Sequence, residues 1–215
     1  MIAVTIGVGQ KYEAVAELAA QSCHSRTGLE THILNHKHVE KYDVESPLLL
    51  KFKLLQEFPN ESRIMYFDSD MIFLRKVDIE AEFCEREEFI CVTDRYSQPF
   101  IQEDARRIGI PANEYFNAGW FILDSERHGP FLDLAEKLFA NFRMPFLEQS
   151  TLNWARKLLA VPTHYASRDY NEVDFMSREP LPNTRIGHFI SGNINGIPLN
   201  LLAEVFAKLG GVSRH

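Results

Sequence analysis

The sequence predicts an α/β protein with a single Rossmann-like domain, because short β-like runs alternate with helical patterns along most of its 215 residues. Residues 2–6 are apolar and β-branched, residues 7–10 form a glycine-containing loop, and helical spacing begins at Tyr12. A second apolar run at residues 63–67 ends at two aspartates. The length allows one such domain with a sizeable core, so we expect one domain over residues 1–215.

The other elements follow from apolar periodicity and from turn residues. Ser46 and Pro47 favour a helix start, because serine accepts a backbone N–H and proline at the first helical position lacks only an N–H that would be unpaired. We expect further strands at residues 31–35, 71–74, 89–93, 118–123 and 185–190, and helices at 46–58, 130–142, 147–159 and 200–209. Residues 161–184 lack periodicity, and we expect an irregular loop there.

Composition excludes several classes of protein. The net charge of −7 argues against extensive nucleic-acid binding, which needs a basic surface. The three cysteines are scattered without metal-site spacing. No run of 18 apolar residues and no basic leader occurs, so we expect no transmembrane segment and a cytoplasmic location.

Asp68 and Asp70 form the main candidate site. An Asp-x-Asp triplet is common by chance, and without a binding role it would be a solvated strand end. Here the triplet directly follows the apolar run at residues 63–67. Two carboxylates one residue apart at the tip of a buried strand would repel each other unless a divalent cation lay between them and a phosphate ligand. The sequence therefore predicts a metal and nucleotide site.

Other polar residues lie at or near the tips of predicted strands. These are the loop at residues 7–9, Asp94 and His188. Since ligands bind at the carboxyl ends of strands in open sheets, we expect these groups to share a crevice with Asp68 and Asp70, and the His188 imidazole to complete a metal shell. The third glycine of the dinucleotide fingerprint is absent after residue 9, so we do not expect NAD.

Five ordered motifs resemble the family 8 retaining glycosyltransferases, which include glycogenin and bacterial lipopolysaccharide galactosyl- and glucosyltransferases. The motifs are Leu49-Leu50-Lys51-Phe52-Lys53-Leu54, Tyr66-Phe67-Asp68-Ser69-Asp70, Tyr115-Phe116-Asn117-Ala118-Gly119, Glu148-Gln149-Ser150-Thr151-Leu152-Asn153 and His188-Phe189-Ile190-Ser191-Gly192. The resemblance covers nearly the whole chain, from Val4 to about Gly192. The resemblance implies a GT-A fold, in which a mixed central sheet carries the site, and transfer of glucose or galactose from a UDP-sugar with Mn²⁺, or alternatively Mg²⁺.

The resemblance also implies a role for each matched residue. It makes Asp68, Asp70 and His188 the metal ligands. Ser69 and Gly192 belong to the same two motifs and join the donor site. The remaining matches are Lys51 beside the donor, Asp94 and Asn117 on the donor sugar, Ile6 and Tyr12 on the uridine side, and Gln149 with Glu148 as the catalytic pair. Two modes of action stay open for that pair: brief covalent capture of the anomeric carbon, or electrostatic support.

The chain departs from the family in some positions. The loop at residues 7–10 lacks the Thr-Asn-Asp character of many relatives, Glu148 stands where relatives carry Asp, and residues 193–195 replace a Lys-Pro-Trp stretch. The acceptor is a carbohydrate, glycolipid or protein that the sequence does not identify. We expect residues 162–182, with Arg168, Tyr170 and Asn171, to form part of the acceptor wall.

Two other functions compete with glycosyl transfer. One is a phosphatase of the haloacid dehalogenase type, whose nucleophile is the first aspartate of an Asp-x-Asp. It fits less well, because that triplet belongs near the N-terminus, before a small turn residue, whereas strand-like residues 71–73 follow here. The other is a nucleotide-sugar binding module without turnover.

Overall fold

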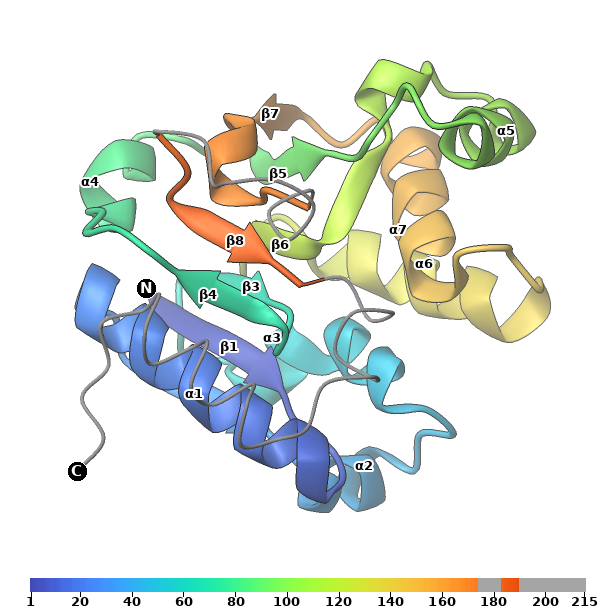
Figure 1. Ribbon diagram of the computed structural model, residues 1–215. Helices are drawn as coiled ribbons and strands as arrows, with labels where there is room; N and C mark the ends of the chain where they lie inside the picture. The colour runs from blue at the N-terminus through green and yellow to red at the C-terminus, as the bar shows by residue number, and fades with distance from the viewer. Residues whose placement is uncertain (174–182, 190–215) are drawn as a thin grey trace.

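The computed structural model describes residues 1–173 and 183–189, and it contains a six-stranded central sheet flanked by helices (Figure 1). The strands of this sheet are β1 (Ile2–Ile6), β2 (Thr31–Leu34), β3 (Arg63–Phe67), β5 (Phe89–Thr93), β6 (Phe116–Asp124) and β7 (Thr163–Tyr165). A two-stranded ribbon consists of β4 (Met71–Phe73) and β8 (Ile186–His188).

Helices connect most of these strands. The α-helices are α1 (Gln10–Thr27), α2 (His36–Tyr42), α3 (Leu54–Glu57), α4 (Ile79–Phe83), α5 (Pro99–Ile108), α6 (Gly129–Asn141) and α7 (Leu147–Leu158). The 3₁₀ helices are η1 (Pro47–Lys53), η2 (Ala112–Glu114) and η3 (Arg168–Tyr170). In the described part of the chain, no helix is both long enough and apolar enough to cross a membrane.

The central sheet is mixed, as expected. Its strand order is β2-β1-β3-β6-β5-β7, and β1 is parallel to both β2 and β3. Strand β6 runs antiparallel to β3 and β5. Because β6 runs in the opposite direction, it begins at the end of the sheet where β3 and β5 finish, and Phe116 lies opposite Thr93.

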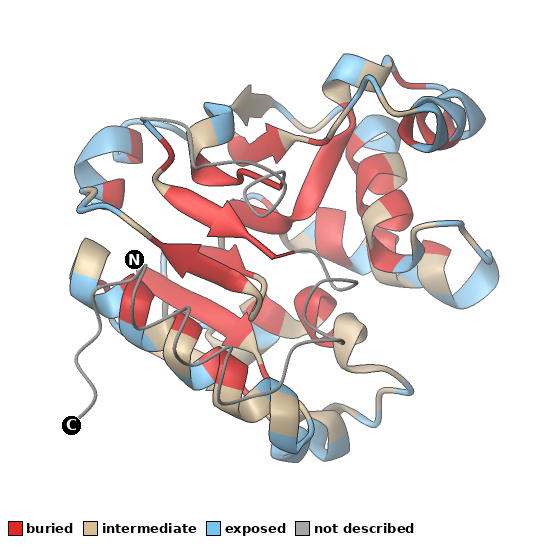
Figure 2. Cartoon of the chain, in the orientation of Figure 1, coloured by how far each residue is buried: buried red, intermediate tan, exposed pale blue. Residues whose placement is uncertain are grey.

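Two hydrophobic clusters cover the two faces of this sheet (Figure 2). One lies under α1 and the β4–β8 ribbon, and the other under η1, α6 and α7. Strand β3 is buried on both faces: Met65 and Phe67 point into the first cluster, and Ile64 and Tyr66 into the second. Since strand side chains alternate, Asp68 continues the Ile64 and Tyr66 side, toward η1 and α7.

Some sequence expectations need correction. The stretch expected to be an irregular loop contains β7 and η3, because Thr163–Tyr165 pairs in parallel with β5. The helix expected from residue 46 to 58 is mostly the 3₁₀ helix η1, followed by the short α3. Helices α2, α4 and α5 were not expected. The expected helix at 200–209 and Gly192 lie outside the described residues.

Candidate metal and nucleotide site

The predicted metal ligands come together at one end of the central sheet. Asp68 and Asp70 occupy the turn between β3 and β4, and His188 lies on β8 opposite Met71. Antiparallel pairing of β4 with β8 thus brings the imidazole beside two carboxylates more than a hundred positions earlier in the chain. One ligand atom from each of the three side chains lies within 4.8 Å of the others.

These distances suit one divalent cation. The His188 Nε2 atom lies 3.2 Å from Asp70 Oδ1 and 3.9 Å from Asp68 Oδ2. Two carboxylates and one imidazole are a common donor set for a transition metal that keeps further positions for other ligands. The residues present therefore fit a divalent ion.

Gly119 provides the space for this cluster. A Cβ atom built there would lie 2.6 Å from His188 Cε1, 2.8 Å from Asn117 Oδ1 and 3.0 Å from Asp68 Oδ2. All three neighbours are held by other contacts, so a larger side chain would displace at least one of them, and two of the three are candidate metal ligands.

The charges of the cluster perturb its imidazole. Burial lowers the pKa of His188, but the carboxylates of Asp70 and Asp68 raise it by more, so the pKa lies above the usual value. A positive charge is thus favoured between the two aspartates. The same electrostatic environment favours a divalent cation.

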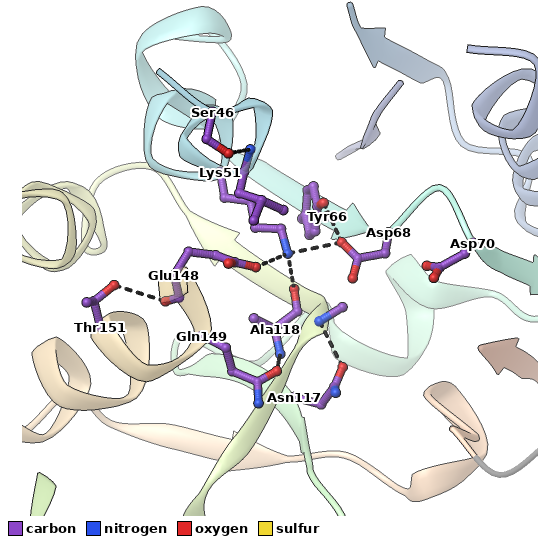
Figure 3. A network of polar contacts seen from close by, with 12 residues as sticks. Ser46, Lys51, Tyr66, Asp68, Asp70, Asn117, Ala118, Glu148, Gln149 and Thr151 are labelled. Atoms are coloured by element: carbon purple, nitrogen blue, oxygen red, sulfur yellow. Dashed lines mark hydrogen bonds and ion pairs between the residues drawn. The ribbon is translucent and has the colours of Figure 1, made fainter. Parts of the chain in front are cut away.

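Lys51 joins Asp68 to the first turn of α7 (Figure 3). Its ammonium group lies 3.0 Å from Asp68 Oδ1, 2.9 Å from Glu148 Oε1 and 3.2 Å from the carbonyl oxygen of Ala118. Lys51 is 1% exposed, and these three acceptors match its three N–H groups. The lysine therefore places one positive charge between two carboxylates and links η1 to the turn after β3, to β6 and to α7.

The pKa values in this network follow from its charges. Burial lowers the pKa of Lys51, but Asp68 and Glu148 raise it to above its usual value. Burial raises the pKa of Asp68, but Lys51 and then His188 lower it by more, and the result is a lowered pKa. The Tyr66 hydroxyl donates to Asp68 Oδ1 at 2.6 Å, and burial with the Asp68 charge raises the pKa of Tyr66 well above 10. Asp68 is thus held ionised.

A second network holds the Gln149 amide. Its Nε2 donates to Asp94 Oδ2 at 2.9 Å, and its Oε1 accepts the N–H of Ala118 at 3.0 Å. Asn117 Nδ2 donates to the same Asp94 oxygen at 3.2 Å. Asp94 and Asn117 are brought together because β5 shifts register after Cys91, which places Val92 opposite Asn117.

A cavity of about 300 Å³ is lined by Asp68 and Asp70 of the candidate metal cluster and by several apolar side chains. Its lining residues are Ile6, Val8, Tyr12, Pro47, Leu48, Lys51, Tyr66, Asp68, Ser69, Asp70 and Glu148. The β1–α1 loop and the start of η1 supply an apolar end, and the turn after β3 supplies an anionic end. This combination suits a ligand with an apolar ring at one end and a metal-bound anion at the other.

Two larger cavities lie elsewhere. One, of about 440 Å³, is lined by Glu87, Arg127 and Phe131 among others, and one of about 800 Å³ by Tyr42, Glu136 and Phe142 among others. Among the described residues, the only group of three potential metal ligands close enough to share an ion is Asp68, Asp70 and His188. The cavity above this group is therefore the candidate site.

The structure brings most predicted site residues into this region. Ile6, Tyr12, Lys51, Asp68, Ser69, Asp70 and Glu148 line the cavity, while Asp94, Asn117, Gln149 and His188 belong to the adjoining hydrogen-bond networks. Gly192 lies outside the described residues.

Three features of the site were not predicted from the sequence. The first is the Tyr66 contact with Asp68, which the alternation of β3 could have indicated. The second is Gly119 beneath the metal ligands. The third is Asn171, which accepts a hydrogen bond from His188 and is 2% exposed, so its expected place in an acceptor wall was wrong. Tyr170, 1% exposed, is buried as well, whereas Arg168 is exposed.

The fold is the GT-A fold of nucleotide-diphospho-sugar transferases. A crystal structure of the galactosyltransferase LgtC with donor and acceptor sugar analogs is 15% identical to the chain, with a TM-score of 0.69, and covers 100% of this chain and 98% of that one. An active-site mutant of LgtC, with glutamate in place of a glutamine, is 16% identical, with a TM-score of 0.65 and coverage of 98% and 95%.

A glycosyltransferase involved in glycosylation of the major capsid of PBCV-1 is also similar. It is 12% identical, with a TM-score of 0.61 and coverage of 97% of this chain and 100% of that one. No family profile and no curated protein matches the chain. At these identities the likeness shows the fold, which confirms the expected GT-A architecture. That all these neighbours are glycosyltransferases agrees with the resemblance found in the sequence.

Proposed function

We propose that the protein is a metal-dependent retaining glycosyltransferase that moves a hexose, glucose or galactose, from a UDP-sugar to an acceptor. The observation that carries this proposal is the cluster of Asp68, Asp70 and His188, two of whose members line a cavity that also has apolar walls. A nucleoside diphosphate has the matching form, with a flat base at one end and a diphosphate that binds divalent ions at the other. The glycosyltransferases of the same fold support the same activity.

The donor would extend along the cavity. Ile6, Val8 and Tyr12 offer apolar surface to the base, and Asp68, Asp70 and His188 would hold the ion on the diphosphate. The sugar would then lie toward the network of Asp94, Asn117 and Gln149, beyond the metal ligands. Lys51 would act on the diphosphate only indirectly, since its ammonium is already bonded to three protein oxygens.

The chemistry requires charge stabilisation at two points. A divalent ion held by Asp68, Asp70 and His188, Mn²⁺ by resemblance, would supply positive charge where the departing diphosphate gains negative charge. On the sugar's reacting face, the Oε1 atom of Gln149 accepts one backbone N–H and keeps a second lone pair. Glu148 is instead paired with Lys51. This difference favours Gln149 as the group facing the anomeric carbon, with Glu148 in a supporting role.

The experiment that tests this function is a donor screen. Several UDP- and GDP-sugars would be incubated with the protein and Mn²⁺, and release of the nucleoside diphosphate would be measured. We expect release from a UDP-hexose with Mn²⁺ and none when a chelator is present. Hydrolysis of a generic aryl phosphate without UDP release would instead indicate a phosphatase. Metal-dependent binding of UDP-sugar without release, across a panel of sugar acceptors, would indicate a binding module.

Replacing Gln149 with alanine should lower turnover far more than donor affinity. The reason is that a group on the reacting face acts mainly when positive charge develops at the anomeric carbon. We expect a fall in turnover of roughly 10²–10³-fold, the range seen when one electrostatic contact to a transition state is removed. Steady-state rates and calorimetric UDP-sugar binding give the two quantities.

The matched control for this variant is Gln102→Ala, since Gln102 is exposed on α5. It should change neither turnover nor binding. Equal losses of turnover and affinity in Gln149→Ala would show that Gln149 serves ground-state binding instead.

A further inference from the structure

The metal-ligand candidate His188 has a defined partner on each ring nitrogen. Its Nε2 faces Asp70 and Asp68, and its Nδ1 lies 2.8 Å from Asn171 Oδ1. His188 and Asn171 are both buried, with 3% and 2% of their surfaces exposed. Which nitrogen carries the proton decides which one can bind a metal, so the orientation of the Asn171 amide matters.

The orientation of the Asn117 amide is fixed by two of its neighbours. Its Oδ1 accepts the backbone N–H of Gly119 at 2.9 Å, and that group can only donate. Its Nδ2 lies 3.2 Å from the Asp94 carboxylate, which accepts when ionised. Turning the amide over would set oxygen against carboxylate and nitrogen against N–H. Asn117 therefore keeps its oxygen on the Gly119 side.

The orientation of the Asn117 amide in turn fixes the orientation of the Asn171 amide. The Asn171 Nδ2 atom lies 2.9 Å from the same Asn117 Oδ1, so Asn171 must present its NH₂ group there. Its own oxygen is then turned toward His188, and an amide oxygen only accepts. His188 must donate from Nδ1, so in the neutral imidazole that binds a metal the Nε2 lone pair lies on the side of Asp68 and Asp70.

The backbone holds Asn171 and His188 in register. The N–H of Glu172 donates to the carbonyl of Ile186 at 3.0 Å, and the N–H of His188 donates to the carbonyl of Glu172 at 3.1 Å. Tyr170, just before Asn171, stacks on Trp120 with ring centroids 5.1 Å apart. Asn171 is thus attached to the β8 strand that carries the imidazole and to the core beneath β6.

From these contacts we infer that Asn171 is a positioning residue that fixes the tautomer and ring orientation of His188 for metal binding, with its own amide set by Asn117, Gly119 and Asp94. The inference rests on the proposed function only in that His188 binds a metal. Because Asp94 Oδ2 also accepts from Gln149, one hydrogen-bonded series joins the metal ligand to the residue proposed for the reacting face. Asn171 does not belong to any of the five sequence motifs.

Two near-isosteric variants separate the hydrogen bond from the packing. Asn171→Leu fills the same space without an acceptor, and Asn171→Asp keeps an acceptor for His188 Nδ1 but loses the donor to Asn117. Mn²⁺ alone is the probe, titrated with detection of free Mn²⁺ by electron paramagnetic resonance. We expect Asn171→Leu to bind Mn²⁺ roughly 10–100-fold more weakly, as is typical when the partner of a metal-binding histidine is removed. Asn171→Asp should bind at least as tightly as the wild type.

The control variant is Asn153→Leu. Asn153 is a buried asparagine on α7 whose amide bonds the backbone of Phe116 and Gln149, away from His188. It should lower the unfolding temperature and leave Mn²⁺ affinity unchanged. Circular dichroism shows whether each variant is folded. If Asn171→Leu does not fold, the inference is tested with Asn171→Asp. A more than tenfold loss of Mn²⁺ affinity in that variant overturns the inference.

The tautomer is read directly by nuclear magnetic resonance. The protein is labelled with ¹⁵N-histidine, and diamagnetic Cd²⁺ replaces Mn²⁺. The His188 signals are assigned by their absence in a His188→Gln variant. We expect them to show a protonated Nδ1 and a metal-bound Nε2. A metal-bound Nδ1, or Mn²⁺ affinity unchanged in folded Asn171→Leu, overturns the inference while leaving the proposed function intact. Absence of Mn²⁺ binding in the wild type would overturn both.

Discussion

Replacing Asp70 with asparagine should abolish metal-dependent turnover and leave the fold nearly unchanged. Asp70 Oδ1 lies 3.2 Å from His188 Nε2, and the two side chains together with Asp68 form the proposed ion site. An amide offers a weaker ligand oxygen and removes one of two negative charges. Changes in groups that merely support metal ligands cost 10–100-fold in affinity, so we expect loss of a charged ligand to cost more than about 100-fold.

The stability of this variant should change little. Asp70 is in a turn and part of its surface is exposed. In the metal-free protein the substitution removes both the repulsion from Asp68 and the attraction to His188, and these two effects have opposite signs. The measurements are Mn²⁺ titration, UDP release and the unfolding temperature. The control is Asp133→Asn on the exposed side of α6, which also removes one carboxylate. Turnover in Asp70→Asn equal to that of the control would rule out Asp70 as a metal ligand.

Replacing Lys51 with methionine should produce the largest loss of stability. Lys51 is buried between Asp68 and Glu148, whose side chains are 27% and 10% exposed. Without the ammonium, two poorly solvated carboxylates would face each other with no cation, and removing one partner of a buried ion pair costs about 3–5 kcal/mol. Methionine keeps the aliphatic volume, so the loss is electrostatic in origin. We expect the unfolding temperature to fall by roughly 10 °C.

The neighbouring Lys53 provides the matched control. It pairs with Glu136 at 2.6 Å, but that carboxylate is one-third exposed. Lys53→Met should therefore cost less than about 1 kcal/mol, as is usual for pairs near the surface. Adding Glu148→Gln to Lys51→Met should recover part of the lost stability, because it removes one uncompensated charge. The unfolding temperatures of Lys51→Met, Lys53→Met and the double variant are measured by thermal melts. Equal losses of stability in Lys51→Met and Lys53→Met would refute a structural role for the Lys51 network.

The sequence predicted the grouping of Asp68, Asp70 and His188 because the ends of buried strands can be recognised from local patterns. Asp68 and Asp70 follow four consecutive apolar residues, 64–67, and an uninterrupted apolar run is typical of a strand buried on both faces. His188 lies within the strand predicted at residues 185–190, between Gly187 and Phe189. The prediction that the strand ends share one region then followed from the general geometry of open α/β sheets.

Other parts of the site depend on contacts between distant residues. Lys51 looked like a donor contact, but its pairing with Glu148 joins positions 97 residues apart, and no local pattern indicates it. Asn171 lies in a stretch without periodicity, and its role arises from the backbone pairing of Glu172 with β8. Strand β7 has only three residues and is set by its parallel pairing with β5.

The central claim is that Asp68, Asp70 and His188 hold a divalent ion that binds the diphosphate of the donor. Calorimetric titration of UDP into the protein, with Mn²⁺ and then with a chelator, tests it most directly. We predict measurable UDP binding with Mn²⁺, and loss of that binding with the chelator and in Asp70→Asn. UDP binding of equal affinity in the presence and absence of metal would contradict the claim.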